Sequence, residues 1–126
     1  MENNNVKIRH FTDLHAWQEA KLLAVLTYKA TSSFPAEEQF GLTSQTRRAA
    51  VSVSANIAEG FARRTSKDKR GFYQTALASL SELESHMLIA HELTFVTKES
   101  LQALRTQIER AGKLLTGLLR SASDRI

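Results

Sequence analysis

The chain has 126 residues, which is the length of one ordinary domain with a hydrophobic core of its own. It contains no cysteine and a single proline, so disulfides and thiolate metal sites are excluded. The formal net charge is +4, and residues 1–80 hold 11 Lys and Arg against 7 Asp and Glu, a bias that suits an anionic partner.

Residues 1–11 are polar and are expected to form a flexible arm ahead of a single domain over residues 12–122. The arm has no apolar run typical of a secretory signal, and no later segment approaches about eighteen unbroken apolar residues. We therefore expect a cytoplasmic protein that makes no contact with a membrane.

Apolar residues recur at intervals of three and four in four segments, which predicts four helices. These helices are expected over residues 13–31, 42–61, 66–93 and 98–121. Thr12 or Asp13 should cap the first helix, while Pro35 disfavours helix in the first connection. Ser66 should cap the third helix and Thr97 the fourth. Because runs typical of strands are missing and the connections are short, the chain is predicted to be all-α, an up-down-up-down antiparallel four-helix bundle.

The second helix is apolar on two sides, with polar residues between them. At about 100° per residue, its core face should hold Leu42, Thr46, Ala49, Val53, Ile57 and Gly60. A polar stripe lies beside this face and consists of Gln45, Arg48, Ser52, Asn56 and Glu59. The second apolar side lies roughly opposite the core face and consists of Val51, Ala55 and Ala58. A surface helix of a monomer does not need this second side, which therefore predicts a further buried contact.

Charged residues also fall among the apolar positions of other helices. Glu84 on the third helix and Lys21 on the first need partners if they are buried. One interpretation is a satisfied polar layer, in which a cation, Arg48 or Lys21, pairs with a carboxylate. That carboxylate would be Glu59 or Glu84. The other interpretation is that the polar stripe, together with Glu84, serves assembly or binding.

A cationic patch is expected where the second helix ends. In the segment FARRTSKDKRGF a single acid, Asp68, faces five cations, which are Arg63, Arg64, Lys67, Lys69 and Arg70. Arg47 lies away from the core face of the second helix and is also available. Such groups can neutralise the phosphates of RNA or DNA, with binding that depends on salt and little on sequence. The alternative is a solvated connection between helices that has no ligand.

Nothing in the sequence indicates catalysis. The histidines are His10, His15, His86 and His91, and no nucleophile elbow, HExxH motif or glycine-rich phosphate loop accompanies them. Glu82 and His86 lie four residues apart on the third helix, but one such pair falls short of a metal site. We therefore expect a protein that is not an enzyme, with no catalytic residue, metal or cofactor.

Three segments together resemble a known family. They read LHAWQEAKLL, FPAEEQFGLTSQTRRAAVSVSANIAEG and RRTSKDKRGFYQTALASLSELESHMLIA, within about residues 11–120. This combination resembles the four-helix-bundle proteins encoded in intervening sequences of bacterial 23S ribosomal RNA genes, to which the accessory variability protein of diversity-generating retroelements is similar in fold. The resemblance implies a pentameric ring of bundles. For the retroelement relative it also implies binding to nucleic acid and to a reverse transcriptase, a partner that we do not transfer to this chain.

Two functions from different classes follow. The first is an oligomeric protein that binds the backbone of RNA or DNA through its basic surface. The second is a protein-interaction or self-assembly scaffold whose positive charge serves solubility and which ignores nucleic acid. The sequence identifies neither the nucleic acid nor a protein partner.

Overall fold

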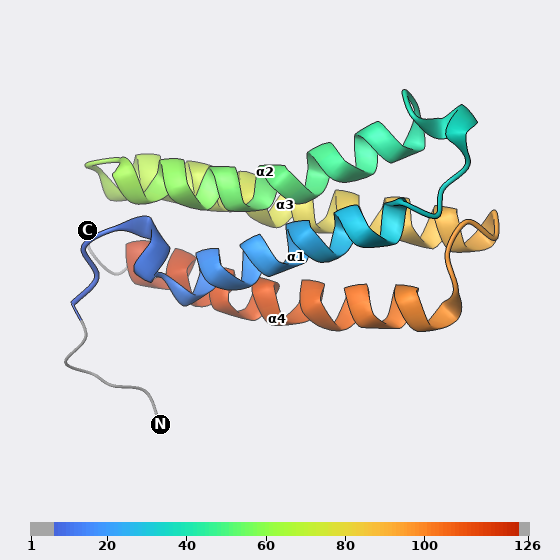
Figure 1. Cartoon of the computed structure of the whole chain (residues 1–126). Helices are drawn as coiled ribbons and strands as arrows, with labels where there is room; N and C mark the ends of the chain where they lie inside the picture. The colour runs from blue at the N-terminus through green and yellow to red at the C-terminus, as the bar shows by residue number, and fades with distance from the viewer. Residues whose placement is uncertain (1–6, 124–126) are drawn as a thin grey trace.

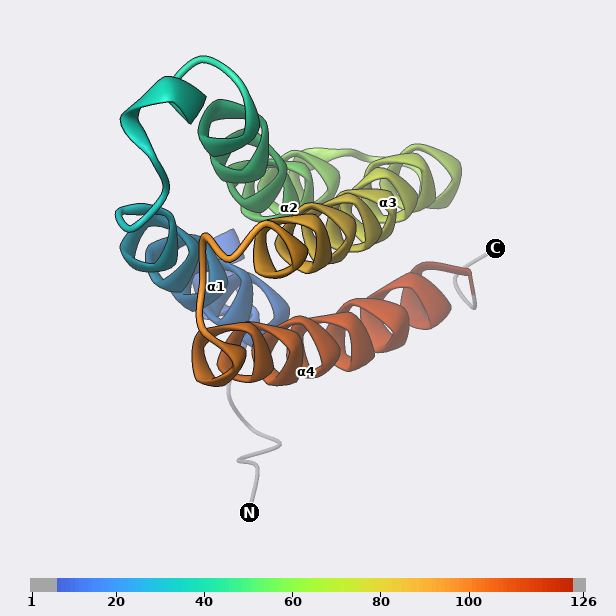
Figure 2. The ribbon, with the colours of Figure 1, turned by 90° about the vertical axis from the view of Figure 1, so that its right-hand side faces the viewer.

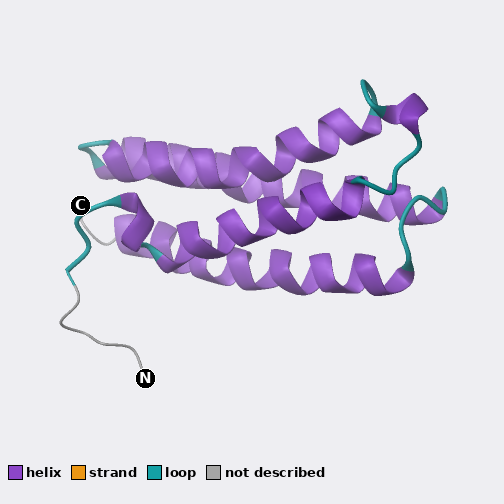
Figure 3. Cartoon of the chain, in the orientation of Figure 1, coloured by secondary structure: helices purple, strands orange, loops and turns teal. Residues whose placement is uncertain are grey.

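The computed structural model describes residues 7–123, and its regular structure is helical throughout (Figure 1, Figure 3). The four long helices are α1 (His15–Thr31), α2 (Leu42–Ala62), α3 (Ser66–Glu92) and α4 (Lys98–Ser123). Two short 3-10 helices, η1 (Phe11–Asp13) and η2 (Ala36–Glu38), precede α1 and α2. No strand occurs in the described range, so the predicted all-α class is confirmed.

The four helices form an antiparallel bundle in which each helix runs opposite to the one before it (Figure 1). Going round the bundle, α2 packs between α1 and α3, and α4 packs between α3 and α1. Helices α1 and α3 lie diagonally across the bundle, and no Cα atom of one comes within 8 Å of a Cα atom of the other (Figure 2). This is the arrangement expected of an up-down-up-down four-helix bundle.

The entry into the bundle is held by a small hydrogen-bonded turn. Of the predicted arm over residues 1–11, residues 1–6 lie outside the described residues, and Phe11 already belongs to η1. The carboxylate of Asp13 accepts hydrogen bonds from the backbone N–H groups of Arg9 at 3.0 Å and His10 at 3.1 Å. These two donors, Arg9 first, lower the pKa of Asp13. Because η1 occupies this turn, α1 begins at His15, and neither Thr12 nor Asp13 is its N-cap.

Threonine side chains cap the N-terminal ends of α3 and α4. At Thr65 the backbone is extended, and its Oγ1 accepts the N–H of Asp68 at 3.1 Å. Ser66 is already inside the helix, so the predicted cap at Ser66 is wrong by one residue. Thr97 caps α4 as predicted, because its Oγ1 accepts the N–H of Ser100 at 3.1 Å. Both caps satisfy a backbone donor that the start of a helix leaves unpaired.

The core is made of apolar side chains from all four helices. Its largest fully buried apolar members are Tyr73, Leu23, Ile57, Leu83, Met87, Leu115 and Val53. On α2 the predicted core face is confirmed, since Thr46, Ala49 and Gly60 are buried with Val53 and Ile57, while Leu42 is half-buried. One face of α2 therefore positions the helix, which leaves its polar stripe and its second apolar side near the surface.

Candidate nucleic-acid interface

The predicted cationic patch lies at the end of the bundle where α2 turns into α3. Arg63 is the C-cap of α2, and Thr65 is the N-cap of α3, so the turn between the helices is very short. Arg64 and Lys67 are exposed, as is the nearby acid Asp68. The short turn therefore brings these charges together at one end of the bundle.

Lys69 is held against the C-terminal end of α2. Its Nζ donates to the carbonyl oxygen of Phe61 at 2.8 Å and to that of Gly60 at 3.4 Å, and it lies 5.4 Å from the ring centroid of Phe61. The last carbonyl groups of a helix carry a partial negative charge that a cation offsets. Lys69 therefore offsets the negative end of the α2 dipole. Without this offset, the dipole would weaken the attraction of the nearby exposed cations for an anion.

Arg63 and Arg70 are partly enclosed by the protein. The Arg63 guanidinium stacks over the ring of Phe72 at 4.6 Å and lies 4.0 Å from the Glu59 carboxylate, but its side chain remains 46% exposed. Arg70 is half-buried, and its Nη1 is buried without a hydrogen-bond partner in the described part of the chain. Arg63 is therefore pre-positioned yet accessible, whereas Arg70 contributes its charge from beneath the surface.

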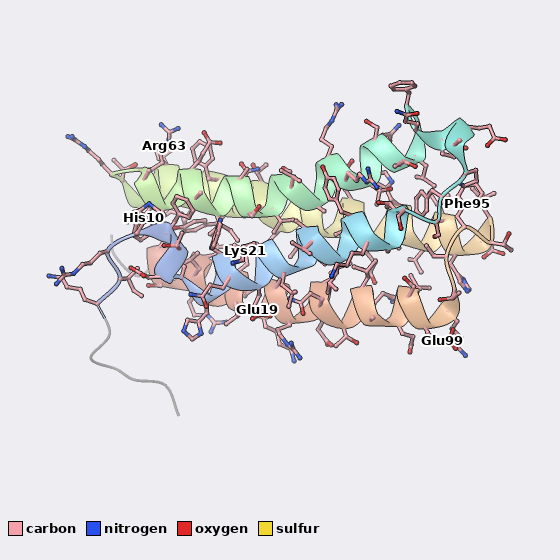
Figure 4. The ribbon with its side chains drawn as sticks, viewed as in Figure 1. His10, Glu19, Lys21, Arg63, Phe95 and Glu99 are labelled. Atoms are coloured by element: carbon pink, nitrogen blue, oxygen red, sulfur yellow. The ribbon has the colours of Figure 1, made fainter. Side chains whose placement is uncertain are left out.

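The N-terminal segment adds cations that the sequence did not associate with the patch. Ile8 lines a cavity of about 430 Å³ together with Phe61 of α2 and other residues of the same bundle end. Its neighbours Lys7 and Arg9 are exposed. Figure 4 shows Arg63 and His10, which continues this segment, at the same end of the bundle. No local pattern could reveal this proximity, because it depends on where the chain enters the bundle.

Arg47, the further cation that was expected to be available for nucleic acid, lies away from this patch. It lies about 24 Å from Arg63 along α2, at 1.5 Å per residue. Its Nε donates to Thr31 Oγ1 at 2.8 Å, its Nη2 donates to the Tyr28 carbonyl at 3.4 Å, and its guanidinium stacks over the Tyr28 ring at 4.5 Å. Arg47 therefore braces the C-terminal end of α1 against α2.

The polar stripe divides into an inner and an outer part. Ser52 Oγ and Ser79 Oγ of α3 are 2.9 Å apart. Asn56 Nδ2 donates to the Ser52 carbonyl at 2.8 Å and to Ser52 Oγ at 3.0 Å. This inner part forms a hydrogen-bonded seam between α2 and α3. Gln45, Arg48 and Glu59 remain exposed and form the outer part.

The charge pairs differ from those that the sequence suggested. Glu84 Oε2 accepts from Arg105 Nε of α4 at 2.9 Å, so this carboxylate does not pair with Arg48 or Lys21. Lys21 Nζ lies 5.4 Å from the ring of Trp17 on its own helix. The predicted polar layer is therefore wrong in its partners, because the side-by-side packing of α3 and α4 brings Arg105 to Glu84.

The described residues contain no cluster of side chains suited to holding a metal ion. His86 Nε2 lies 3.0 Å from Glu82 Oε2, as the spacing of these residues on one helix suggested. No third ligand joins them, and no group of three or more metal-ligating side chains occurs in residues 7–123. In the same range, none of the helices has the length and apolarity needed to cross a bilayer.

The fold and this surface together define a small helical-bundle protein with a basic end. Residues 12–117 match the family described as 23S rRNA-intervening sequence protein, and the chain belongs to this family. It is also similar to the crystal structure of a protein of unknown function from the S23 ribosomal protein family of Bacteroides thetaiotaomicron. That similarity has a TM-score of 0.74 and 20% identity, covering 82% of this chain and 97% of the other. It shows the fold alone; comparison with curated proteins gives no match.

Proposed function

We propose that the protein is a non-enzymatic homo-oligomer that binds the sugar-phosphate backbone of RNA or DNA through the α2–α3 end of the bundle. The observation that carries this proposal is the exposed set of Arg63, Arg64 and Lys67 beside Lys69. Lys69 offsets the partial negative charge at the end of α2, and the first turn of α3 adds the partial positive charge of a helix N-terminus. The local field at this end therefore favours phosphate.

Binding through this patch should depend little on base sequence. Recognition of unpaired bases usually requires exposed aromatic rings on which the bases stack. Here Phe72 is half-buried beneath Arg63, and Tyr73 is 2% exposed, so neither ring offers a free face. The contacts available are charge-assisted bonds to phosphate oxygens, which position a nucleic acid without reading it.

Assembly would multiply this weak contact. The resemblance to the ribosomal-intervening family implies a ring of five copies, and the second apolar side of α2 supports a contact between copies, since Val51 is 43% exposed and Ala55 is exposed in the single chain. Several identical patches on one particle raise the effective concentration of the next contact. An assembly could therefore hold a nucleic acid that one copy binds weakly.

The second candidate function is a protein-interaction scaffold without a nucleic-acid ligand. It is favoured by a separate observation, the fully displayed ring of Phe40, which is 91% exposed beside α2. In this reading the protein assembles through its apolar surfaces, and the basic end only maintains solubility.

Fluorescence anisotropy separates the two candidates. The protein is titrated into labelled duplex DNA and labelled single-stranded RNA at salt concentrations from about 50 to about 200 mM. If Arg63, Arg64 and Lys67 each neutralise one phosphate, the slope of log K against log salt for duplex DNA should be about −2.7 per patch. The variant Arg64→Gln with Lys67→Gln should make that slope less steep by about 1.8.

The matched control removes two exposed lysines from α4, in the variant Lys98→Gln with Lys113→Gln. This control has the same net charge as the patch variant, and we expect it to keep the wild-type slope. The nucleic-acid proposal is rejected by equal losses in the two variants, or by absent binding at the lowest salt. Absent binding from a stable oligomer would leave the scaffold as the function.

A further inference from the structure

We propose that copies of this protein join head to tail, with a groove between α1 and α2 of one copy receiving the outer face of α3 of the next. The inference rests on the homo-oligomer proposed above and specifies its contact. A head-to-tail contact joins two different surfaces, so each copy must present both of them. The structure carries two such surfaces, with opposite charge.

The first surface, which we call the α1–α2 groove, contains exposed apolar side chains among polar ones. It has a volume of about 600 Å³, and its lining includes Tyr28, Phe40 and Val51. These three side chains are 46%, 91% and 43% exposed. Burial of the Phe40 ring, which is almost wholly in water, against the apolar surface of a partner would be favourable. The groove therefore has the composition of a contact surface.

Two arginines give the α1–α2 groove its positive charge. Arg47 is fixed by its hydrogen bond to Thr31 and by stacking on Tyr28, so its guanidinium loses little conformational freedom when a carboxylate approaches. Arg48 is exposed and has no hydrogen bond or ion pair with any described residue. A partner that carries carboxylates beside apolar side chains would match this groove.

The second surface, which we call the α3 face, has that composition. Leu88, Ile89 and Leu93, at the C-terminal end of α3, are 42%, 47% and 50% exposed. Glu82 and Glu92 are exposed on the same helix. From residue 71 to residue 97 the sequence contains no Lys or Arg. This half of α3 is therefore both apolar and negatively charged.

The positions of the two surfaces suit a chain of contacts between copies. Because α1 and α3 lie diagonally across the bundle, the α1–α2 groove and the α3 face cannot meet within one copy (Figure 2). On α4, no large apolar side chain is strongly exposed between residues 98 and 123, so this helix is suited to face solvent. Each copy therefore offers a groove and an apolar face for contacts with its neighbours, and a polar side at α4.

The test uses two variants that each block one surface, Phe40→Asp in the groove and Ile89→Asp on the α3 face. Both side chains are exposed, so the bundle should still fold, which circular dichroism checks. Light scattering after size exclusion should show each variant alone as a monomer near 14.1 kDa. Mixed together, they share one intact groove and one intact face, so they should form a one-to-one dimer of twice that mass.

Charge reversal tests the electrostatic part of the same contact. Arg48→Glu and Glu92→Arg should each weaken assembly, and the double variant should restore it, because the opposite charges again meet across the contact. Lys113→Glu on α4 is the matched control and should leave assembly unchanged. Wild-type protein that is monomeric overturns the proposal. So does a mixture of Phe40→Asp and Ile89→Asp that stays monomeric, or an Ile89→Asp variant that assembles normally.

Failure of this contact can be told apart from failure of the proposed nucleic-acid binding. The blocking variants keep Arg63, Arg64 and Lys67, so as monomers they should bind duplex DNA more weakly but with the salt slope expected for one patch. Intact assembly without DNA binding removes the nucleic-acid proposal and leaves the head-to-tail contact in place. DNA binding by wild-type protein that is monomeric supports the nucleic-acid proposal and removes the head-to-tail contact.

Discussion

At Gly60, α2 and α3 pack so closely that a single added methyl group would test the contact. A Cβ atom at this position would lie 2.6 Å from Tyr73 Cε1, 2.9 Å from Tyr73 Cδ1 and 3.0 Å from Phe72 Cβ. Favourable contacts between carbon atoms lie at about 3.5–4.0 Å, so the nearest contact is short by about 1 Å. Tyr73 is 2% exposed and its ring also lines the cavity of about 430 Å³, whereas Phe72 Cβ is fixed by the backbone of α3.

The expected cost of Gly60→Ala follows from two opposing terms. Overpacking a buried site costs about 1–3 kcal/mol, and replacing glycine by alanine inside a helix gains about 1 kcal/mol. Because the clash involves a buried ring and a backbone-proximal Cβ, we expect the cost at the upper end. The net loss should be about 1–2 kcal/mol, which lowers Tm by about 3–8 °C in a domain of this size.

The matched controls are Gly71→Ala on α3 and Gly117→Ala on α4. Both glycines are helical and exposed, and an added Cβ at either meets no atom within 4 Å. These variants should gain about 0.5–1 kcal/mol. Thermal unfolding is measured at one protein concentration, since assembly would raise the apparent Tm. The reasoning fails if Gly60→Ala is as stable as the controls.

Three further predictions concern polar contacts. Arg47→Ala should lower the free energy of unfolding by about 1–2 kcal/mol in urea titrations, because it removes a charge-assisted hydrogen bond and a stacked ring; an unchanged midpoint would contradict the bracing role. A double-mutant cycle of Ser52→Ala and Ser79→Ala should give a coupling of about 0.5–1.5 kcal/mol, and additive losses would show that the seam is not a direct bond. The lowered pKa of Asp13 means that its contribution is present above about pH 3.9 and is lost as the pH falls through the folded-state pKa. The amide signal of Arg9 in NMR spectra should then titrate with a midpoint below about 3.9, and a higher midpoint would exclude the turn.

The helices and their inward faces could be predicted from the sequence because they depend on local spacing. Val53 and Ile57 repeat at helical intervals on α2, and both are buried as expected. The cap at Thr97 was also readable, since capping involves residues three positions apart. The start of α1 was not, because the turn at Asp13 uses backbone donors from the preceding segment, which no periodic pattern reveals.

The sequence could not show which cationic side chains are exposed and which are held by hydrogen bonds to other helices. Arg64 and Lys69 look alike in a run of charges, yet one is exposed and the other donates to the carbonyl groups that end α2. Arg47 looked free because it lies off the core face, but it reaches across to Thr31 of α1. Long cationic side chains select partners within several ångströms, and those partners belong to other helices.

The sequence by itself determined the four-helix architecture, the core face of α2 and the concentration of positive charge near its end. Each depends on residues close together in the chain, where spacing and local composition are sufficient. The tertiary structure decided which charges pair, as with Glu84 and Arg105, and which large side chain stands in water, as with Phe40. These outcomes depend on how helices distant in sequence lie against each other, and that arrangement is set by the packing of the whole core.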